Sequence, residues 1–193
     1  MRLKKYGQIA STSASSSMNN RVYPCFSDGT IRIAPFCERH LTAKYVSWLN
    51  DPIVVRFSEQ RHYKHTLQTC LDYFVSQQKS ANYFLAIEHE DRAFGHVGNI
   101  GVTVDLNNNI ADLAIIIGDK RVWGTGVGSR AWNAAIRTLI DTIGFRIVTA
   151  GTMEVNKPMV KLMKSSGMHI YGIIPRRFLW DGLEVGLVMA STP

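Results

Sequence analysis

A glycine-rich junction between an apolar run and an amphipathic segment limits the folds that this chain can adopt. Residues 113–117 are almost wholly apolar, as expected of a central strand covered on both faces. Three glycines spaced two apart follow within 124–128, a helical stripe then runs to about Ile143, and 145–152 is again β-branched. A strand, a helix and a strand in this order predict two parallel strands joined by a right-handed crossover.

The rest of the chain predicts an α/β (α+β) domain with a mixed, mostly antiparallel sheet flanked by helices. The last two strands are expected to be antiparallel to each other, joined through the polar segments Arg176-Arg177 and Asp181-Gly182. Alternation and helical stripes place strands at 30–34, 83–88, 95–106, 113–117, 145–152, 168–174 and 183–189, and helices at 38–49, 66–78 and 128–143.

At 193 residues the chain is expected to form one domain, over 29–193. Residues 1–28 are rich in Ser, Thr and Asn, and we expect a loosely ordered segment docked at most through 22–26. No stretch approaches the roughly 20 apolar residues that cross a bilayer, and the start lacks the apolar centre of a secretory signal. We therefore expect a cytoplasmic protein without a membrane partner.

The net charge and the cysteine pattern limit the classes of ligand and partner that we expect for this chain. The net charge of +7 favours anionic ligands, but no pattern of interleaved basic and aromatic residues marks a nucleic-acid platform. Nucleic acid is therefore an unlikely partner, and a phosphate-bearing small molecule explains the charge as well. The three cysteines form no CxxC pair, and the six histidines are scattered, so we predict reduced thiols and no metal.

The glycine-rich junction is suited to bind a phosphate. Glycines allow positive φ and close approach of backbone N–H groups to a ligand, and the first turn of a helix leaves amide donors unpaired. A tight turn that packs the helix closely would need the same glycines, so the pattern alone leaves both interpretations open. Two known phosphate loops do not fit, because the Walker lysine is absent and the spacing is GxGxG rather than GxGxxG.

The junction resembles the acetyl-CoA loop of the GNAT superfamily. That loop reads Gln or Arg, two residues, then Gly-x-Gly or Gly-x-Ala, and Arg121-Val122-Trp123-Gly124-Thr125-Gly126 matches it in full. Segment 111–120 with Trp123-Gly124 resembles the branch of ribosomal-protein N-terminal and amino-sugar acetyltransferases. Further similarity lies at 48–52 and at Asn156, Leu162 and Gly167, so that the resemblance covers about 31–189.

The resemblance implies a GNAT fold whose parallel strand pair splays apart to admit coenzyme A. Acetyl-CoA would be the acyl donor, its pantetheine arm pairing with the first strand and its pyrophosphate resting on the loop. Asn156 would contact the CoA arm, although it would serve equally as a helix N-cap. Paired protomers are common in this family, so a homodimer is possible. The implied CoA-binding residues are Ile115, Ile116, Ile117, Arg121, Val122, Trp123, Gly124, Thr125, Gly126, Val127, Gly128, Ser129 and Asn156.

The resemblance also suggests a mechanism. A primary amine must lose its proton, and related sequences place a carboxylate where Asp112 stands. Asp112 could equally be a solvated residue at a strand start, and as a base it would act through water, because Asp is shorter than the usual Glu. A backbone N–H near Ile116 would stabilise the oxyanion. Many family members protonate the leaving thiolate with a Tyr where this chain has Met163, so that step has no assigned donor beyond the alternatives Tyr171 and His169.

The acceptor remains open between three hypotheses. Arg56, His62 and Arg176 could bind a phosphorylated acceptor, although each is individually a typical surface charge. They favour N-acetylation of a small-molecule amine, with a nucleotide-linked amino sugar as one candidate. The alternatives are acetylation of a protein N-terminus or lysine, and a GNAT-like module that holds CoA without catalysis.

Overall fold

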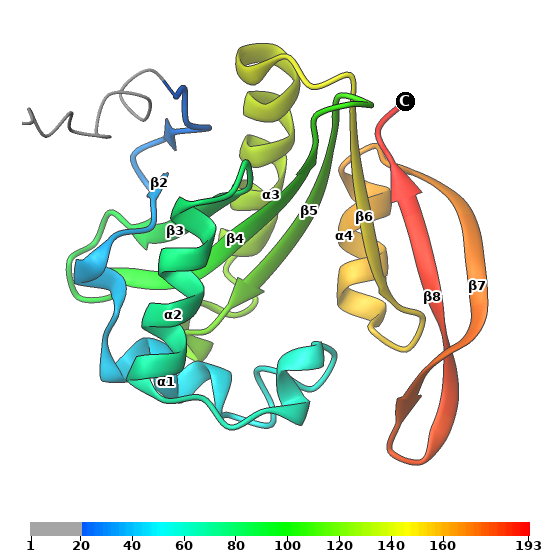
Figure 1. The fold of residues 1–193 in the computed structure, drawn as a ribbon, viewed down its shortest axis with the longest axis horizontal. Helices are drawn as coiled ribbons and strands as arrows, with labels where there is room; N and C mark the ends of the chain where they lie inside the picture. Colours follow the sequence, from blue (N-terminus) through cyan, green and yellow to red (C-terminus); the bar gives the residue numbers. More distant parts are fainter. Residues whose placement is uncertain (1–20) are drawn as a thin grey trace, which may run out of the picture.

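The structure, a computed structural model, describes residues 21–193. Within them lies one eight-stranded sheet in the order β1-β2-β3-β4-β5-β6-β8-β7 (Figure 1). Neighbouring strands are antiparallel except β5 and β6. The predicted mixed, mostly antiparallel sheet is therefore confirmed. The strands are β1 (Phe26–Ser27), β2 (Ile31–Pro35), β3 (Tyr83–His89), β4 (His96–Asp105), β5 (Ile110–Ile117), β6 (Ile147–Met153), β7 (His169–Trp180) and β8 (Leu183–Ser191).

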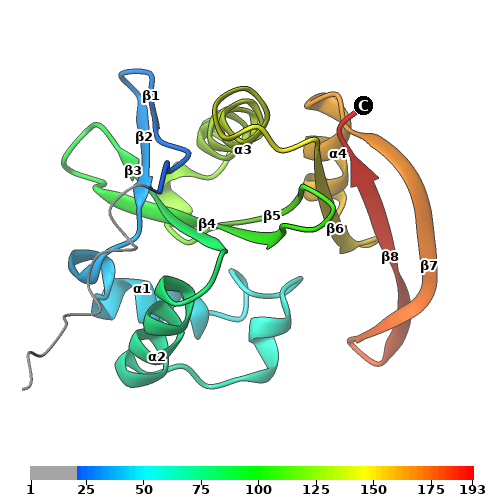
Figure 2. The same cartoon turned by 45° about the horizontal axis from the view of Figure 1, so that its top comes forward.

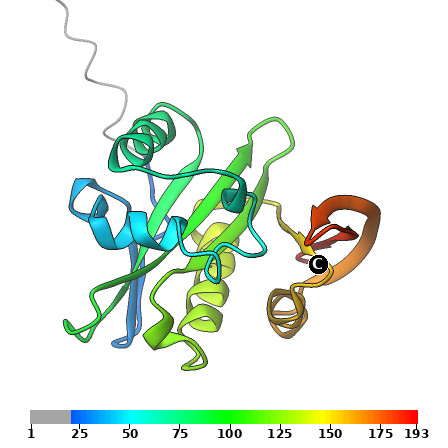
Figure 3. The same cartoon turned by 90° about the horizontal axis from the view of Figure 1, so that it is seen from below.

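Helices cover both faces of the sheet. α1 (Ala43–Leu49) and α2 (Leu67–Gln78) lie on one face, and α3 (Val127–Arg137) and α4 (Lys157–Ser165) lie on the other (Figures 2 and 3). A π-helical segment, η4 (Thr138–Ile143), extends α3. Three short 3-10 helices complete the described elements: η1 (Glu38–His40), η2 (Glu59–His62) and η3 (Lys120–Val122).

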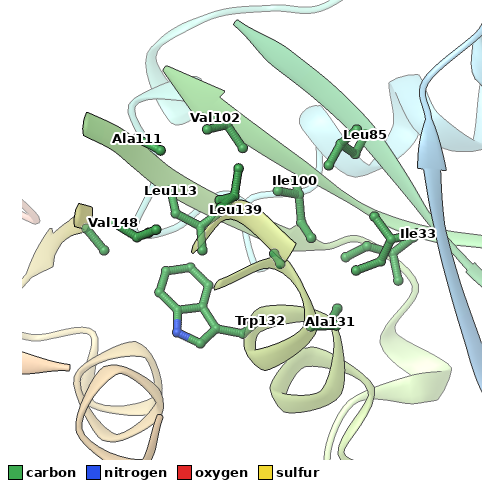
Figure 4. Close-up of a cluster of buried hydrophobic side chains, with 14 of the residues drawn as sticks. Ile33, Leu85, Ile100, Val102, Ala111, Leu113, Ala131, Trp132, Leu139 and Val148 are labelled. Carbon is green, nitrogen blue, oxygen red and sulfur yellow. The ribbon is translucent and has the colours of Figure 1, made fainter. Parts of the chain in front are cut away.

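Each face of the sheet has its own apolar core. Trp132 of α3 is fully buried in the larger core, where it faces β5 and β6 residues such as Leu113 and Val148 (Figure 4). Its Nε1 donates a hydrogen bond to Ser166 Oγ at 3.1 Å, which ties α3 to the end of α4. The smaller core joins α1 and α2 to the opposite face through Phe36, Tyr45, Trp48 and Phe74, among others.

The helix boundaries follow local capping. α2 begins after Thr66, whose side chain accepts a hydrogen bond from the Thr69 amide, as the predicted N-cap requires. The single helix predicted over 38–49 is wrong, because Thr42 caps a new helix through the Tyr45 amide and separates η1 from α1. The helix after the glycine junction ends at Gly144, at φ 89°, as predicted, but its last turn is π-helical.

The C-terminal hairpin is longer than predicted. β7 does not end near residue 174 but continues to Trp180, through a register irregularity between Ile174 and Phe178. Arg176 adopts φ 55° there, so a bulge absorbs the polar residues that we expected in the connection. The turn itself is therefore short, at Asp181-Gly182, and both of its residues have positive φ.

The described part of the N-terminal segment is attached to the sheet. The Arg21 guanidinium donates to the carbonyl oxygens of Ser80, Ala81 and Asn82, and it lies 3.9 Å from the centre of the Tyr83 ring. β1 then pairs with β2. Residues 1–20, the rest of the segment expected to be loose, lie outside the described residues.

The parallel pair separates soon after it forms. β5 and β6 pair over three residues only, 110–112 with 147–149. Beyond them β5 continues beside β4 to Ile117, whereas β6 continues beside β8 to Met153. Figure 1 shows the two strands diverging from this point. The β6-facing edge of β5 over 113–117 is therefore left without a strand partner, and this opening positions the site.

Candidate functional site

A cavity of about 810 Å³ fills the opening between β5 and β6. Its walls come from β5, the glycine junction, the end of β6, the start of α4 and the segment 53–59 after α1. The predicted CoA-binding residues that line it are Ile115, Ile116, Ile117, Val122, Trp123, Gly124, Gly126, Gly128, Ser129 and Asn156.

The junction enters α3 through left-handed backbone. Gly124 has φ 76° and Gly126 has φ 89°, a region that residues with a Cβ rarely adopt. Gly126 is also the N-cap of α3, and it offers no side chain to satisfy the amides of the first turn. The sequence therefore leaves the N-terminus of α3 uncapped at the wall of the cavity.

Several amide groups at this helix start are free. The amides of Val122, Trp123 and Thr125 bond to nearby carbonyl oxygens, at 3.2, 3.2 and 3.4 Å. Within residues 21–193, five others have no hydrogen-bond partner: those of Gly124, Gly126, Val127, Gly128 and Ser129. Unpaired amides and the positive end of the helix dipole together suit a phosphate group.

Three predicted CoA residues have side chains directed elsewhere. Arg121 donates to Asp119 through Nε at 3.0 Å and Nη2 at 2.6 Å, and its guanidinium lies over the Phe94 ring. Thr125 Oγ1 donates to the Val122 carbonyl at 2.8 Å, and Val127 is buried in the larger core. These residues shape the junction, and none of the three lines the cavity.

Asp119 fastens the junction to α1. Its side chain is only 5% exposed, and Lys44 of α1 reaches its Oδ2 at 2.9 Å. The Arg121 guanidinium, and after it the Lys44 ammonium group, hold the pKa of this carboxyl well below its usual range. Lys44 also donates to the carbonyl oxygens of Phe94 and His96, so one cation joins α1, β4 and the junction.

Asn156 is the N-cap of α4. Its Oδ1 accepts a hydrogen bond from the Met159 amide at 3.3 Å, and its Nδ2 donates to Thr152 Oγ1 at 3.0 Å. The residue also lines the cavity. Capping and contact with a ligand are therefore compatible at this position.

A second cavity, of about 430 Å³, lies on the face of the sheet covered by α1 and α2. Four aromatic rings contribute to its wall: Tyr45, Tyr63, Tyr73 and Phe84. Ser58 and residues 114–116 of β5 line both cavities. A ligand in the first cavity and a ligand in the second would therefore meet at the middle of β5.

Asp112 lies where β5 and β6 are still paired, two residues before Ala114. Its Oδ2 accepts a hydrogen bond from Thr149 Oγ1 at 2.7 Å. The side chain is exposed, yet the protein atoms crowded around it raise its pKa, and the Thr149 hydroxyl partly offsets this. Asp112 does not itself line either cavity.

Of the three predicted acceptor-binding residues, only Arg56 lines a cavity. His62 is exposed, with Nε2 3.8 Å from Glu59 Oε2. Arg176 is exposed in the hairpin and pairs with Glu184 at 2.9 Å, so its charge is already balanced.

The two alternative proton donors are also outside both cavities. His169 and Tyr171 are exposed on β7 and line neither of them. Met163, where the resemblance predicts a Tyr in other chains, is fully buried in the larger core. The lining residues of the second cavity include other hydroxyl groups, which sequence reasoning did not select.

The polar groups of the second cavity were missed at the sequence level. The sequence pattern places Tyr45 only in a predicted helix and Asn99 only in a predicted strand. One signal was present, because Asn99 and Gly101, on one side of the strand, are interspersed with the apolar residues Val97, Ile100 and Val102. The cavity itself depends on how 58–65 folds back against β4 and β5, which no local pattern shows.

Residues 21–193 contain neither a candidate membrane span nor a group of side chains that could hold a metal ion. No helix there is both long and apolar enough to cross a bilayer. No three His, Cys, Asp or Glu side chains in that range are grouped closely enough to hold a metal ion.

Comparison with known proteins gives one family and many similar folds. A model described as an acetyltransferase (GNAT) domain matches residues 30–169. An uncharacterised protein of Methanocaldococcus jannaschii is 21% identical over 122 residues, which are 63% of this chain and 25% of that protein. The chain thus spans about a quarter of the length of this curated relative.

Solved structures share the fold at low identity. A spermidine N-acetyltransferase from Vibrio cholerae, in complex with CoA and spermine, is 13% identical with a TM-score of 0.76 over 85% of this chain and 95% of that one. A GNAT-family acetyltransferase from Bacillus anthracis is 12% identical with a TM-score of 0.73 over 86% and 96%. RimL, a ribosomal L7/L12 alpha-N-protein acetyltransferase in complex with CoA, is 12% identical with a TM-score of 0.74 over 84% and 93%.

Proposed function

Because the chain belongs to the GNAT acetyltransferase family, we propose that it transfers an acetyl group from acetyl-CoA to the primary amine of a small molecule. One observation carries this proposal: within residues 21–193, four residues with unpaired amides at the start of α3, Gly124, Gly126, Gly128 and Ser129, line a cavity that opens where β5 leaves β6. The amides suit the pyrophosphate of CoA, and the free edge of β5 over 113–117 suits the amide groups of its pantetheine arm. Neighbours of the same fold were solved with CoA bound, which supports this assignment.

The free edge of β5 has one occupied position. Trp123 Nε1 donates to the Ile117 carbonyl oxygen at 2.9 Å, so the indole covers the end of the strand nearest the junction. Pairing with the pantetheine arm is therefore left to backbone groups before that carbonyl. We assign the oxyanion donor to a backbone N–H near Ile116, in the part of β5 that lines both cavities.

We assign the second cavity to the amine acceptor. It reaches β5 at the residues that also line the first cavity, so an amine held there can approach the thioester. Asp112 is the proposed base. It lies two residues from Ala114 along the strand, roughly 7 Å, so it would accept the amine proton through a water molecule.

A nucleotide-linked amino sugar has narrow support as the acceptor. The sequence argument for this acceptor used three basic side chains, and of these only Arg56 lines a cavity. Neither Arg176, paired with Glu184, nor His62 adds support for a phosphorylated carrier. The proposed acceptor is therefore a small primary amine.

The experiment measures thermal unfolding with and without acetyl-CoA. At a ligand concentration 100 times Kd, binding stabilises the native state by about 2.7 kcal/mol, which raises Tm by roughly 5–10 °C in a chain of this size. Gly128→Trp should abolish the shift, because a side chain there starts 3.4 Å from Ile117 and fills the cavity at the free amides. Gly128 is preferable to Gly126 for this test, since its φ is not positive.

Gly101→Leu is the matched control. It lies in the second cavity, and a Cβ at this position meets no atom within 4 Å. It should keep the acetyl-CoA shift while it blocks acceptor turnover, measured as thiol release with small amines and peptides. A normal shift in Gly128→Trp would contradict the CoA site. A shift without turnover on any amine would favour the non-catalytic module, and turnover on peptides alone would favour a protein acceptor.

A further inference from the structure

Asn99 carries an unpaired hydrogen-bond donor at the second cavity. The residue is 3% exposed, pairs opposite Ile116 across β4 and β5, and lines the cavity. Its Nδ2 has no hydrogen-bond partner among residues 21–193. Leaving a buried amide donor unpaired is energetically costly, so such a group calls for an explanation.

His96 fixes which end of the Asn99 amide is free. Its Nε2 lies 2.8 Å from Asn99 Oδ1 and 3.1 Å from the Gly98 carbonyl oxygen. A carbonyl oxygen can only accept, so Nε2 must carry the proton, and the Asn99 atom facing it must be the oxygen. The amide nitrogen is therefore directed away from His96.

The surroundings of His96 bury the ring and keep it neutral. The ring packs against Trp48 and His40, with ring centres 5.0 and 4.9 Å away. Burial lowers the pKa of His96 to about 4, and the nearby charges of His40 and Lys44 act in the same direction. At neutral pH the imidazole therefore carries one proton, which it donates toward Asn99.

The cavity around Asn99 has a distinct chemistry. His65 Nε2 is a second buried polar atom without a partner there, again counting only described residues. Lys64 is the one charged side chain among the described residues that line this cavity, and no carboxylate is among them. Four aromatic rings supply apolar surface. A polyamine, which needs carboxylates to pair with its several cations, is a poor match for such a wall.

We propose that Asn99 is a specificity-determining residue that donates from Nδ2 to an oxygen atom of the amine substrate, with His96 as its positioning residue. The substrate class is then a primary amine with a carbonyl or carboxylate oxygen near the nitrogen and an apolar or aromatic group. The inference rests on the proposed function and specifies its acceptor. It places the oxygen beside Asn99 and the reacting nitrogen toward 114–116 of β5.

The test uses pairs of amines that differ only in the oxygen-bearing group. Phenylalaninamide is compared with 2-phenylethylamine, leucinamide with isopentylamine, and spermidine represents polyamines. We expect kcat/KM to be about 5- to 150-fold higher for the carbonyl-bearing member of each pair, as one hydrogen bond to a buried donor allows. Calorimetric binding of the same amines in the presence of CoA gives a readout that does not depend on turnover.

Variants then assign the preference to Asn99. Asn99→Ala should bring each pair to within about twofold, through KM for the acceptor, with KM for acetyl-CoA unchanged. His96→Leu should have the same effect because the amide is no longer oriented, whereas His96→Gln, which can still donate to Oδ1, should keep most of the preference. Asn107→Ala, in the exposed turn after β4, is the matched control and should behave like the wild type.

The outcomes separate this inference from the proposed function. Equal use of both members of each pair by the wild type, or a preference that survives Asn99→Ala, overturns the role of Asn99. Preference for spermidine, or failure of every carbonyl-bearing amine to bind with CoA present, overturns the substrate class. Loss of acetyl-CoA binding itself would instead overturn the proposed function.

Discussion

At the scale of single residues, the protonation of Asp112 depends in part on Thr149, its neighbour on β6 in the parallel strand pair. Burial among protein atoms raises the pKa of Asp112, and the Thr149 hydroxyl, which donates to the carboxylate at 2.7 Å, partly offsets this rise. Only the ionised carboxylate can accept a proton, so activity should rise with pH through this pKa. The pairing of β5 with β6 thus tunes the proposed base.

Two substitutions test that role. Asp112→Asn should lower kcat about 10²-fold or more, with little change in KM for acetyl-CoA. Thr149→Val removes the hydrogen bond that favours the ionised form, so the pKa of Asp112 rises and the acidic limb of the kcat/KM profile should move to higher pH. The profile is measured by thiol release across pH 5–9. An unmoved limb in Thr149→Val, or full turnover in Asp112→Asn, would exclude Asp112 as the base.

Single residues were also where sequence reasoning was least complete. Asn156 before Lys157-Pro158 predicts an N-cap, and Asn156 is the N-cap of α4 in the structure. Arg176 gave no such local signal, because its partner Glu184 lies on the other strand of the hairpin. Asn99 became informative only through His96, whose tautomer depends on the contacts around it. The role of a polar side chain is set by its partners in the fold, which the local sequence pattern does not identify.

At the scale of elements, the contact between α1 and the end of β5 sets the geometry of the junction. Gly118 lies against the indole of Trp48, and a Cβ there would come within 2.0 Å of the ring. The approach lets Lys44 reach Asp119, and Lys120 Nζ reach Asp51 Oδ2 at 2.6 Å. Packing and two ion pairs therefore join the first helix to the glycine junction.

Gly118→Ala and Gly101→Ala form a matched pair for this contact. Gly118→Ala should destabilise the protein by roughly 1–3 kcal/mol, since overpacking displaces the indole or the backbone. Gly101→Ala, where a Cβ meets nothing within 4 Å, should be neutral or stabilise by about 0.5–1 kcal/mol. Urea unfolding of both variants gives the comparison. Equal stabilities would mean that Trp48 moves aside freely and that the contact does not position the junction.

Elements with strong local signals were predicted well. The apolar run, the glycines and the amphipathic stripe together indicated β5, α3 and β6 in their correct order. The break between η1 and α1 was missed because 38–49 keeps a helical stripe across the Thr42 cap. The bulge in β7 was missed because Pro175 and two arginines resemble a loop, although pairing with β8 continues beyond them.

At the scale of the whole molecule, two halves of the sheet enclose the first cavity. One connection between them is the three-residue pairing of β5 with β6. Another lies at the tip of the β7–β8 hairpin, where Trp180 Nε1 donates to the Arg56 carbonyl oxygen at 2.9 Å and Arg61 Nη2 donates to the Leu179 carbonyl oxygen at 3.1 Å. The rings of Trp180 and Phe57 also pack with centres 5.6 Å apart. Segment 53–62 is thereby fastened across the opening.

The hairpin tip and segment 53–62 meet through a small number of contacts. We therefore expect these contacts to affect local unfolding of the segment rather than the global free energy of unfolding. Trp180→Ala should leave urea unfolding nearly unchanged, because the residue lies outside both cores. Amide hydrogen exchange across 53–62 should become about tenfold faster or more, and KM for the acceptor should rise several-fold as Ser58 and its neighbours lose their fixed position. Leu183→Ala, an exposed substitution on the same hairpin, is the matched control and should change neither quantity.

The two readouts together decide what the hairpin does. Faster exchange with a raised KM would mean that the C-terminal hairpin orders the wall shared by both cavities, and that its register is under functional constraint. Faster exchange with an unchanged KM would limit the contact to holding the loop, while unchanged exchange would show that 53–62 is ordered by α1 and β5 alone. The physical reason for expecting the first result is that Ser58 lines both cavities, whereas its segment meets the far half of the sheet through the hairpin tip.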